Sequence, residues 1–493
     1  MIEMTLAEVA RVVGGRLHRA DGSERVTGTV EFDSRRLTAG SLFVALPGER
    51  VDGHAYAATA VTEGGAVGVL AAREVEAPSV IVPAPPSGTA HERSVALTGD
   101  TDGSGAAVLA ALGALARHVV TELSRTERSR TGLHVVGVTG SSGKTSTKDL
   151  IAQVLEPRGP TVAPPGSFNN ELGHPWTALR ADADTRHLVL ELSARGPGHI
   201  AELAAVAPPR IGVVLNVGSA HVGEFGSQEG IARTKGELVE ALPEDGVAVL
   251  NVDDPLVAAM AGRTRARVVG FGEGPDATVR AERVRLDEHA RATFDLVAGG
   301  ERAEVRLSLV GEHHVANALA AAAVALELGS PVPDVAADLG AATRRSARRM
   351  EVTTSADGVT VLNDSYNANP ESVRAALKTL ASMTSERRSW AVLGVMGELG
   401  ADSVSAHDEI GRLAVRLNIN RLVVVGEQAA AMHHGASHEG SWGEESVLVP
   451  DTDAAVALLR DTVRPDDVVL VKASKVAELW RVADALLGEG GSA

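Results

Sequence analysis

Short apolar runs separated by helical stretches fill most of the chain after about residue 105. The runs are rich in Val, Ile and Leu without polar alternation, which is typical of parallel strands buried on both faces. We expect strands at residues 134–138, 187–192, 210–217, 246–251, 359–362, 390–395, 421–425, 446–449 and 467–471. Helices between such strands predict an α/β protein with mostly parallel sheets.

The first 95 residues follow a mixed pattern. Residues 5–13 have the spacing of an amphipathic helix, and residues 41–46 have the composition of a strand. Composition changes at a stretch of turn formers (83–105) and at the basic cluster RRSARR (344–349). We therefore expect three domains: an N-terminal mixed α/β domain (1–95), a central parallel-sheet domain (105–345) and a smaller, Rossmann-like doubly wound domain (346–493).

A glycine-rich segment, GVTGSSGKTSTKD (137–149), lies between an expected strand and an expected helix. Gly140 and Gly143 allow backbone amides to close around phosphate oxygens, and the helix N-terminus adds a favourable dipole. Lys144 can reach the terminal phosphates, and the Thr145 hydroxyl can bind Mg²⁺. This pattern predicts a P-loop-type site for a nucleoside triphosphate, although it is not a standard Walker A, because Val138 stands where that pattern has glycine. A chance turn rich in glycine and serine is the alternative.

Two polar residues follow strands of the central domain. Glu191 ends the expected strand 187–192, and His221 follows 210–217. Ligands of parallel sheets bind beyond the carboxyl ends of the strands, so both residues lie on the phosphate side if these strands are neighbours. A carboxylate is a preferred Mg²⁺ ligand and an imidazole a less usual one. Alternatively, Glu191 is a helix cap and His221 an ordinary loop residue.

Lys235 lies in the helical stretch SQEGIARTKGELVEAL (227–242). One interpretation is a solvated lysine on an amphipathic helix. The other is a desolvated lysine whose neutral amine adds CO₂ to form a carbamate, because only the free amine reacts. A carbamate would supply anionic oxygen ligands to a second metal ion.

Other polar segments are candidates for nucleotide contacts. Asp364 lies in the turn-rich NDSYNANPES (363–372), and Arg349 ends the basic cluster. His313 and Asn317 lie four apart on one helical face, where they can read an adenine edge. The alternatives are a purely structural loop for Asp364 and a solvated basic cluster for Arg349. For His313 and Asn317 the alternative is the exposed start of a helix.

In the N-terminal domain, Ser34 and Arg35 precede the expected strand 41–46, and Asp52 and His54 follow it. Serine and arginine suit an anionic or diphosphate ligand. A surface loop is the alternative.

Composition narrows the class of protein. Lys and Arg total 47 against 64 Asp and Glu, for a net charge of −17, which argues against a nucleic-acid partner or an anionic membrane. Zero cysteines exclude disulfides, thiolate metal sites and a cysteine nucleophile. No secretory signal is evident, and the longest apolar run, 106–116, is too short to span a bilayer. We expect a cytoplasmic protein without stable membrane insertion.

Taken together, the segments resemble the Mur ligase family from residue 30 to about residue 475. The motifs that carry the resemblance are the phosphate loop, DSRRLTAGSLFVALPGERVDGH (33–54), SFNNELGHPWTAL (167–179), NVGSAHVGEFGS (216–227), NDSYNANPES (363–372) and MGELG (396–400). The last two are most similar to members that join D-alanyl-D-alanine to UDP-N-acetylmuramoyl-tripeptide. The resemblance implies an ATP-dependent, amide-forming ligase of peptidoglycan precursor synthesis, with an acyl-phosphate intermediate and ADP and phosphate as products.

The resemblance also implies roles for single residues. Catalysis would involve Lys144, Glu191, His221 and Lys235. Two Mg²⁺ ions would be bound by Thr145, Glu191, His221 and carbamylated Lys235. ATP would contact Gly140, Ser141, Ser142, Gly143, Lys144, Thr145, Ser146, His313, Asn317, Arg349 and Asp364. The UDP-linked precursor would contact Ser34, Arg35, Asp52, His54, Asn169 and Asn170.

The N-terminal domain would hold the precursor, and the C-terminal domain would bind the dipeptide and close over ATP. A monomer is expected. The sequence departs from the family pattern at His314, where asparagine is common, and at Val395, which replaces an acidic residue. The nucleotide-contacting arginine is one of Arg345, Arg348 and Arg349.

Two rival functions stay open. A sister ligase would add a single amino acid or another peptide to its precursor. A non-catalytic ATP-regulated binding protein would close on ATP without ligation, but it would not need the Glu191, His221 and Lys235 set.

Overall fold

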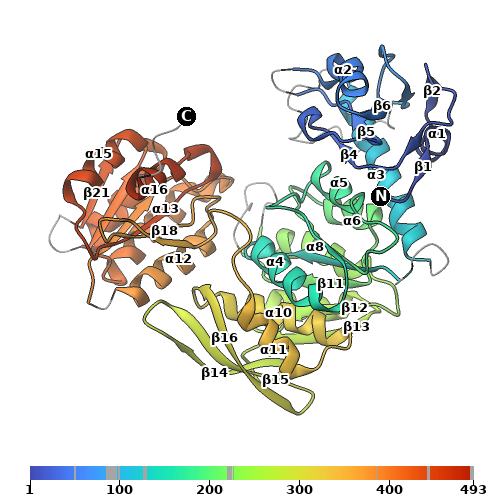
Figure 1. Ribbon diagram of the computed structural model, residues 1–493. Coiled ribbons are helices and arrows are strands. Elements are labelled where there is room, and N and C mark those ends of the chain that lie inside the picture. The colour runs from blue at the N-terminus through green and yellow to red at the C-terminus, as the bar shows by residue number, and fades with distance from the viewer. Residues whose placement is uncertain are drawn as a thin grey trace.

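The computed structural model describes residues 1–48, 51–84, 97, 100, 102–125, 130, 132–218, 225, 227–384, 386–440 and 445–488. Within these residues, sheets of five, nine and six strands follow one another along the chain, and a two-stranded sheet lies near the N-terminus (Figure 1). The large sheets fall within residues 1–95, 105–345 and 346–493, called here the N-terminal, central and C-terminal regions. The predicted α/β class is confirmed, while the domain boundaries stay predictions.

The N-terminal region has a mostly parallel sheet in which only β2 runs antiparallel, beside β7. Its strand order is β2 (Arg16–His18), β7 (Ser79–Ile81), β6 (Ala66–Ala71), β5 (Ser41–Val44) and β4 (Val30–Glu31). β1 (Met4–Thr5) pairs with β3 (Arg25–Val26), and α2 spans Ala57–Thr62.

The predicted first helix is α1 (Leu6–Val13), which begins one residue later than expected because Thr5 is its N-cap. The Thr5 hydroxyl accepts from the Glu8 N–H while the Glu8 carboxylate accepts from the Thr5 N–H, forming a capping box. The buried side chains Leu6, Val9, Ala10 and Val13 recur at helical spacing and form one apolar face.

Helix α3 (Ser104–Leu123) links the first two regions. It contacts α1 and β6 of the N-terminal region and α5 (Gly173–Ala178) and α6 (His199–Val206) of the central region. The helix is long and apolar enough to cross a membrane, so the expectation that this stretch is too short is wrong. The error arose because the uninterrupted apolar run ends at Ala116, before Arg117, whereas the helix continues to Leu123. However, 67% of its most apolar window is buried in the structure, as in a core helix.

The central sheet is parallel from β9 to β14 and antiparallel from β14 to β16. Its order is β16 (Glu301–Val310), β15 (Arg291–Ala298), β14 (Val279–Leu286), β13 (Arg267–Gly272), β12 (Val247–Asn251), β11 (Ile211–Val214), β8 (His134–Thr139), β10 (His187–Glu191) and β9 (Thr161–Val162). Its other helices include α4 (Lys144–Leu155), α8 (Gln228–Glu240), α9 (Pro255–Ala258), α10 (His314–Glu327) and α11 (Val332–Ala341).

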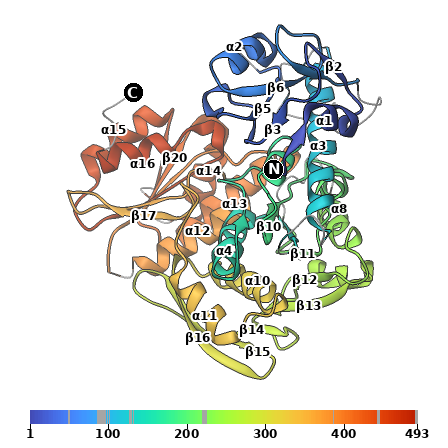
Figure 2. The same ribbon diagram turned by 45° about the vertical axis from the view of Figure 1, so that its right-hand side comes forward.

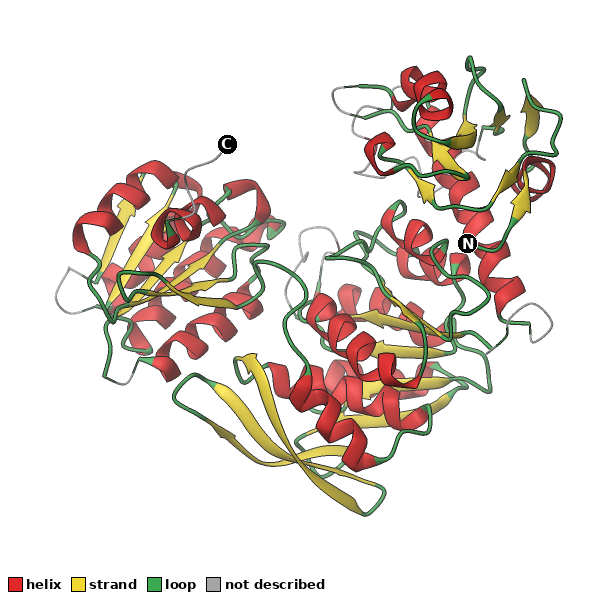
Figure 3. Ribbon diagram, viewed as in Figure 1, coloured by secondary structure: helices red, strands yellow, loops and turns green. Residues whose placement is uncertain are grey.

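All four strands predicted in this region are present. The short edge strand β9, the strand β13 and the antiparallel ribbon β14–β16, which extends from the sheet in Figures 1 and 3, were not predicted. Buried and exposed residues mix along β14, as expected of antiparallel strands with one solvated face. A search for continuous apolar runs does not detect such strands.

The C-terminal sheet contains all five strands predicted for it, and only its edge strand β17 is antiparallel. Its order is β17 (Glu351–Thr354), β18 (Thr360–Asn363), β22 (Val468–Lys472), β19 (Ser389–Leu393), β20 (Arg421–Val425) and β21 (Ser446–Val449). The helices are α12 (Pro370–Met383), α13 (Ser403–Arg416), α14 (Ala430–Glu439), α15 (Thr452–Thr462) and α16 (Trp480–Leu487).

The central and C-terminal regions meet at the carboxyl ends of their strands. The C-terminal region (orange to red) and the central region (green to yellow) can be followed in Figure 2. Asn369, the N-cap of α12, donates from Nδ2 to the carbonyl oxygen of Ser141 at 3.4 Å, so the start of α12 touches the phosphate loop.

Candidate active site

The phosphate loop joins β8 to α4 and needs both of its predicted glycines. A Cβ on Gly140 would lie 2.9 Å from the Leu215 Cβ, and one on Gly143, whose φ is +79°, would lie 2.7 Å from the Asn317 Oδ1. The Lys144 ammonium folds back and donates to the Gly140 carbonyl oxygen at 2.7 Å. The first amides of α4 have no partner within the helix, so they point out toward an anion site.

Asn216 completes this loop, although the sequence analysis gave it no role. Its Oδ1 accepts from the backbone N–H groups of Ser141 (3.0 Å) and Ser142 (2.9 Å). These two amides, predicted to bind ATP, are therefore paired with a side chain in this structure. The signal was an asparagine two residues after β11, the strand that neighbours β8, at the same edge of the sheet.

Glu191 lies at the end of β10, in register with Val138 on β8. The two strands are therefore neighbours, which is the condition under which Glu191 was expected to lie on the phosphate side. The residue is 1% exposed. Oε2 accepts from the Thr145 hydroxyl at 2.9 Å, and Oε1 accepts from Ser167 (3.1 Å) and from Asn169 (2.7 Å). A hydroxyl and a carboxylate in contact beside the phosphate loop fit a hard divalent cation such as Mg²⁺.

Lys235 is buried in α8, with 6% of its surface exposed. Within the described part of the chain its amine has no hydrogen bond or ion pair. Burial, followed by the charge of Lys144, holds the pKa of Lys235 well below its ordinary value of 10.5. Burial excludes the interpretation as a solvated lysine. His221, predicted as a further metal ligand, lies outside the described residues.

Of the three arginines considered in the basic cluster, Arg349 is the one that faces the site, which it reaches from the C-terminal region. Its Nη2 donates to the Thr145 hydroxyl oxygen at 3.1 Å, and its guanidinium lies 4.1 Å from the ring centroid of Tyr366. In contrast, Arg345 pairs with Glu156, and Arg348 stacks on Trp480.

Asp364 is held by Lys472, a buried residue at the end of β22 that the sequence analysis did not single out. The carboxylate accepts from the Lys472 ammonium at 2.5 Å and from the Met350 N–H at 3.0 Å. The pKa of Lys472 is lowered from its ordinary value because burial outweighs the opposing effect of the Asp364 charge. Its signal was a lysine closing the apolar strand VVLVK.

His313 and Asn317 lie at the start of α10 and both line the site. The Asn317 Oδ1 accepts from the Thr147 hydroxyl at 3.1 Å. Burial lowers the pKa of His313 to about 4, so its imidazole is neutral at pH 7. His314, the unusual residue of this motif, is also buried, and its Nδ1 lies 3.3 Å from the Asn317 Nδ2.

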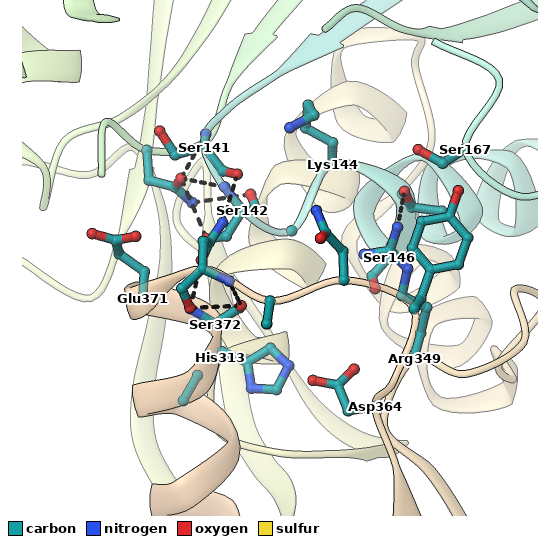
Figure 4. Close-up of a pocket in the computed structure, with 18 of the residues that line it drawn as sticks. Ser141, Ser142, Lys144, Ser146, Ser167, His313, Arg349, Asp364, Glu371 and Ser372 are labelled. Atoms are coloured by element: carbon teal, nitrogen blue, oxygen red, sulfur yellow. Dashed lines mark hydrogen bonds between the residues drawn. The ribbon is translucent and has the colours of Figure 1, made fainter. Parts of the chain in front are cut away.

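These groups surround a cavity of about 410 Å³ between the central and C-terminal regions (Figure 4). That volume is typical of small-molecule sites. The predicted residues that line it are Ser141, Ser142, Gly143, Lys144, Thr145, Ser146, Asn169, Glu191, His313, Asn317, Arg349 and Asp364.

The residues predicted to bind the precursor are dispersed. Asn169 belongs to the Glu191 cluster, and the Asn170 Oδ1 accepts from the Gly173 N–H at 2.9 Å near the start of α5. Ser34 and the exposed Arg35 lie in a short 3₁₀ helix, where Arg35 pairs with Asp33. Their contact with the precursor stays a prediction.

Asp52 and His54 hold a loop of the N-terminal region together. The His54 Nδ1 donates to Asp52 at 2.7 Å, and its Nε2 accepts from the Ala72 N–H at 3.1 Å. Asp52 also pairs with Arg73. Both ring nitrogens of His54 are used within the protein, so its imidazole stabilises the fold.

Replacing Asp52 with Asn is expected to loosen this loop at neutral pH. Burial alone would raise the pKa of Asp52, but hydrogen bonds from His54 and Arg73 outweigh it and lower the pKa from 3.8 to about 2. A depressed carboxyl pKa stabilises the fold above pH 4, and the effect is lost as the pH falls through 2. Because the side chain is 35% exposed, we expect a loss of only about 1 kcal/mol.

Amide hydrogen exchange of peptides covering β6 and β7 measures this effect, with about fivefold faster exchange expected in Asp52→Asn at pH 7. The difference should shrink toward pH 3. Asp33→Asn, at the exposed pair with Arg35, is the control. Equal exchange rates in Asp52→Asn and the wild type at pH 7 would contradict the stabilising role.

Comparison with known proteins identifies the family. Three family models match consecutive parts of the chain: the Mur ligase family catalytic domain at 27–115, the Mur ligase middle domain at 138–325, and the Mur ligase glutamate ligase domain at 348–475. The chain belongs to the Mur ligase family. A Mur ligase of Mycobacterium tuberculosis, UDP-N-acetylmuramoyl-tripeptide–D-alanyl-D-alanine ligase, is 56% identical over 99% of this chain and 98% of that protein.

Solved Mur ligase structures share the fold. MurF from Acinetobacter baumannii superposes with a TM-score of 0.82 at 28% identity, covering 99% of both chains. MurF from Thermotoga maritima, in complex with ADP, has a TM-score of 0.75 at 28% identity, covering 94% of this chain and 98% of that one. The predicted family and fold class are confirmed.

Proposed function

We propose that this Mur ligase joins D-alanyl-D-alanine to UDP-N-acetylmuramoyl-tripeptide, with cleavage of ATP to ADP and phosphate, in peptidoglycan precursor synthesis. The similarity to the M. tuberculosis ligase extends over nearly the whole of both chains, which supports the same activity. The observation that carries the proposal is the shared cavity, where phosphate-loop residues, the Glu191 cluster and C-terminal residues face one space.

In the first step, the terminal carboxylate of the tripeptide attacks the γ-phosphate of ATP and forms an acyl phosphate and ADP. Such transfers depend on alignment and charge neutralisation more than on covalent help. Lys144, the first amides of α4 and Arg349 place positive charge around the phosphates. The neutral His313 and Asn317, at the start of α10, lie where they can contact the base or ribose.

Thr145 and Glu191 would hold Mg²⁺, since their hard oxygen atoms already meet beside the phosphate loop. An ion bound there would neutralise charge on the triphosphate. Ser167 and Asn169 fix the Glu191 carboxylate from its other side. We propose that a second Mg²⁺ ion is bound in part by Lys235 in its carbamylated form. The lowered pKa of Lys235 favours the neutral amine, which is the form that reacts with CO₂.

In the second step, the neutral amine of the dipeptide attacks the activated carbonyl, and phosphate leaves from the tetrahedral intermediate. Water would hydrolyse the acyl phosphate, so the C-terminal region is expected to shield it. The contact between Asn369 and the phosphate loop supports this role for the start of α12. A cytoplasmic location, the absence of membrane insertion and a monomeric state stay predictions.

Phosphate release by the purified protein tests the proposal. The assay contains ATP, Mg²⁺ and UDP-N-acetylmuramoyl-tripeptide, with or without D-alanyl-D-alanine. The mass of the product is measured by mass spectrometry. We expect dipeptide-dependent release and a mass gain of one dipeptide less water. Turnover only with a shorter precursor and a single amino acid would instead assign a sister ligase, and ATP binding without any release would assign a binding protein.

A further inference from the structure

We propose that Glu398 binds the ammonium group of the incoming dipeptide and so selects for a substrate with a free amino terminus. The inference rests on the function proposed above and adds a substrate-binding residue to it. Glu398 lines the same cavity as Lys144 and Glu191 but belongs to the C-terminal region.

The backbone fixes the direction of the Glu398 side chain. It lies in the turn MGELG (396–400), which follows β19, and has a φ of +64°, a conformation that few non-glycine residues adopt. Met396 and Leu399, on either side, are buried in the core of the C-terminal region. With its neighbours turned inward, the exposed Glu398 side chain is left facing the cavity. Strained residues of this kind occur at ligand sites.

A buried histidine holds the turn in place. The His407 Nε2 accepts from the Met396 N–H at 2.9 Å. The His407 Nδ1 lies 2.6 Å from the carbonyl oxygen of Ser403 and donates to it, which leaves Nε2 as the acceptor. The turn is therefore fastened to α13 through one imidazole, so Glu398 is presented by a well-anchored backbone.

Four carboxylates from the described part of the chain line the cavity: Glu191, Asp364, Glu371 and Glu398. Glu191 is engaged by Thr145, Ser167 and Asn169, and Asp364 by Lys472 and the Met350 N–H. Glu371 lies close to Gly218, whose N–H donates to the Ser141 hydroxyl: a Cβ on Gly218 would lie 2.6 Å from the Glu371 Cδ. Glu398 reaches the cavity from the exposed turn after β19, in the C-terminal region to which Asp364 and Glu371 also belong.

Electrostatics puts Glu398 near the reacting groups. Burial lowers the pKa of Lys144, and the charges of Glu191 and Glu398 both oppose this shift. The Glu398 charge is therefore felt at the lysine that would hold the γ-phosphate. A dipeptide ammonium bound to Glu398 would start close to the acyl phosphate, and it would release one proton to water before its neutral amine attacks.

The chemistry of the substrate complements this position. A peptide α-amino group has a pKa near 8, so D-alanyl-D-alanine carries an ammonium group at pH 7. A carboxylate in the cavity attracts this cation, whereas the anionic phosphates and precursor bind to Lys144 and Arg349. Opposite charges thus direct the two kinds of substrate group to different residues of the cavity.

Steady-state kinetics of Glu398→Gln tests the inference. The variant keeps the shape of the side chain and removes its charge. We expect the KM for D-alanyl-D-alanine to rise by about 10- to 100-fold, the range for a lost charged hydrogen bond, with the KM for ATP changed by less than about twofold. Hydroxylamine trapping of the acyl phosphate, formed without dipeptide, should continue at the wild-type rate.

Two further variants serve as controls. Glu398→Asp keeps the charge and tolerates a positive φ, so it should fold and recover most of the affinity for the dipeptide. Glu427→Gln changes an exposed carboxylate after the neighbouring strand β20, outside the cavity, and should leave all three substrate KM values unchanged.

The outcomes separate this inference from the proposed function. If the wild type shows no dipeptide-dependent phosphate release, the proposed function itself fails. If the wild type turns over but Glu398→Gln has an unchanged KM for the dipeptide, only the role of Glu398 is overturned. An equal rise in all KM values, or a selective rise in Glu371→Gln instead, would also overturn it.

Discussion

Lys144→Ala is expected to lower kcat/KM by about 10²- to 10³-fold, the cost of removing one group that stabilises developing charge. Its ammonium is held at the mouth of the phosphate loop by the Gly140 carbonyl oxygen, 2.7 Å away. Arg349 already binds the Thr145 hydroxyl and is stacked on Tyr366, so it cannot take over the position of Lys144 without leaving both contacts. The loss should appear in dipeptide-dependent phosphate release.

Lys378→Ala is the matched control, because it removes an exposed lysine from α12, away from the cavity. It should retain wild-type turnover. A calorimetric titration with ATP separates binding from chemistry, and Lys144→Ala should also weaken ATP binding. Normal ATP-dependent turnover of Lys144→Ala would contradict the role given to the phosphate loop.

The phosphate loop and most parallel strands were predictable because their signals are local. All five strands of the C-terminal region are present within two residues of their predicted ends, since each is a continuous apolar run. The position of Glu191 was predictable only on the condition that its strand neighbours β8. The strand order β11-β8-β10 meets that condition.

The missed residues depend on which strand ends meet in space. Lys472 reaches Asp364 because β22 lies next to β18, although 108 residues separate them along the chain. Asn216 and Glu398 likewise follow strands, and nothing in their own segments shows what they face. For His54 the position after an expected strand did not reveal its partners: its Nε2 accepts from Ala72, which lies 18 residues further along the chain.

Lys235→Ala is expected to lose about 10²-fold or more in kcat, and a short-chain carboxylic acid should restore part of it. The amine is buried, and within the described residues no acidic partner compensates its charge. Burial therefore lowers its pKa, which raises the fraction of neutral amine near pH 7. A neutral amine can add CO₂ to form a carbamate. The anionic oxygens of the carbamate can bind a metal ion and offset its charge, which the uncharged amine cannot do.

The rescue distinguishes a carbamate from a lysine that only fills space. Acetate or propionate can enter the volume vacated in Lys235→Ala and return an anionic oxygen to the same place, whereas a packing defect gains nothing from the acid. Phosphate release is measured across a series of acid concentrations, with Lys378→Ala as the control that should not respond. Since the carbamate forms only from the neutral amine, wild-type activity should also fall when CO₂ is removed at low pH. Full activity of Lys235→Ala without added acid would rule out the carbamate.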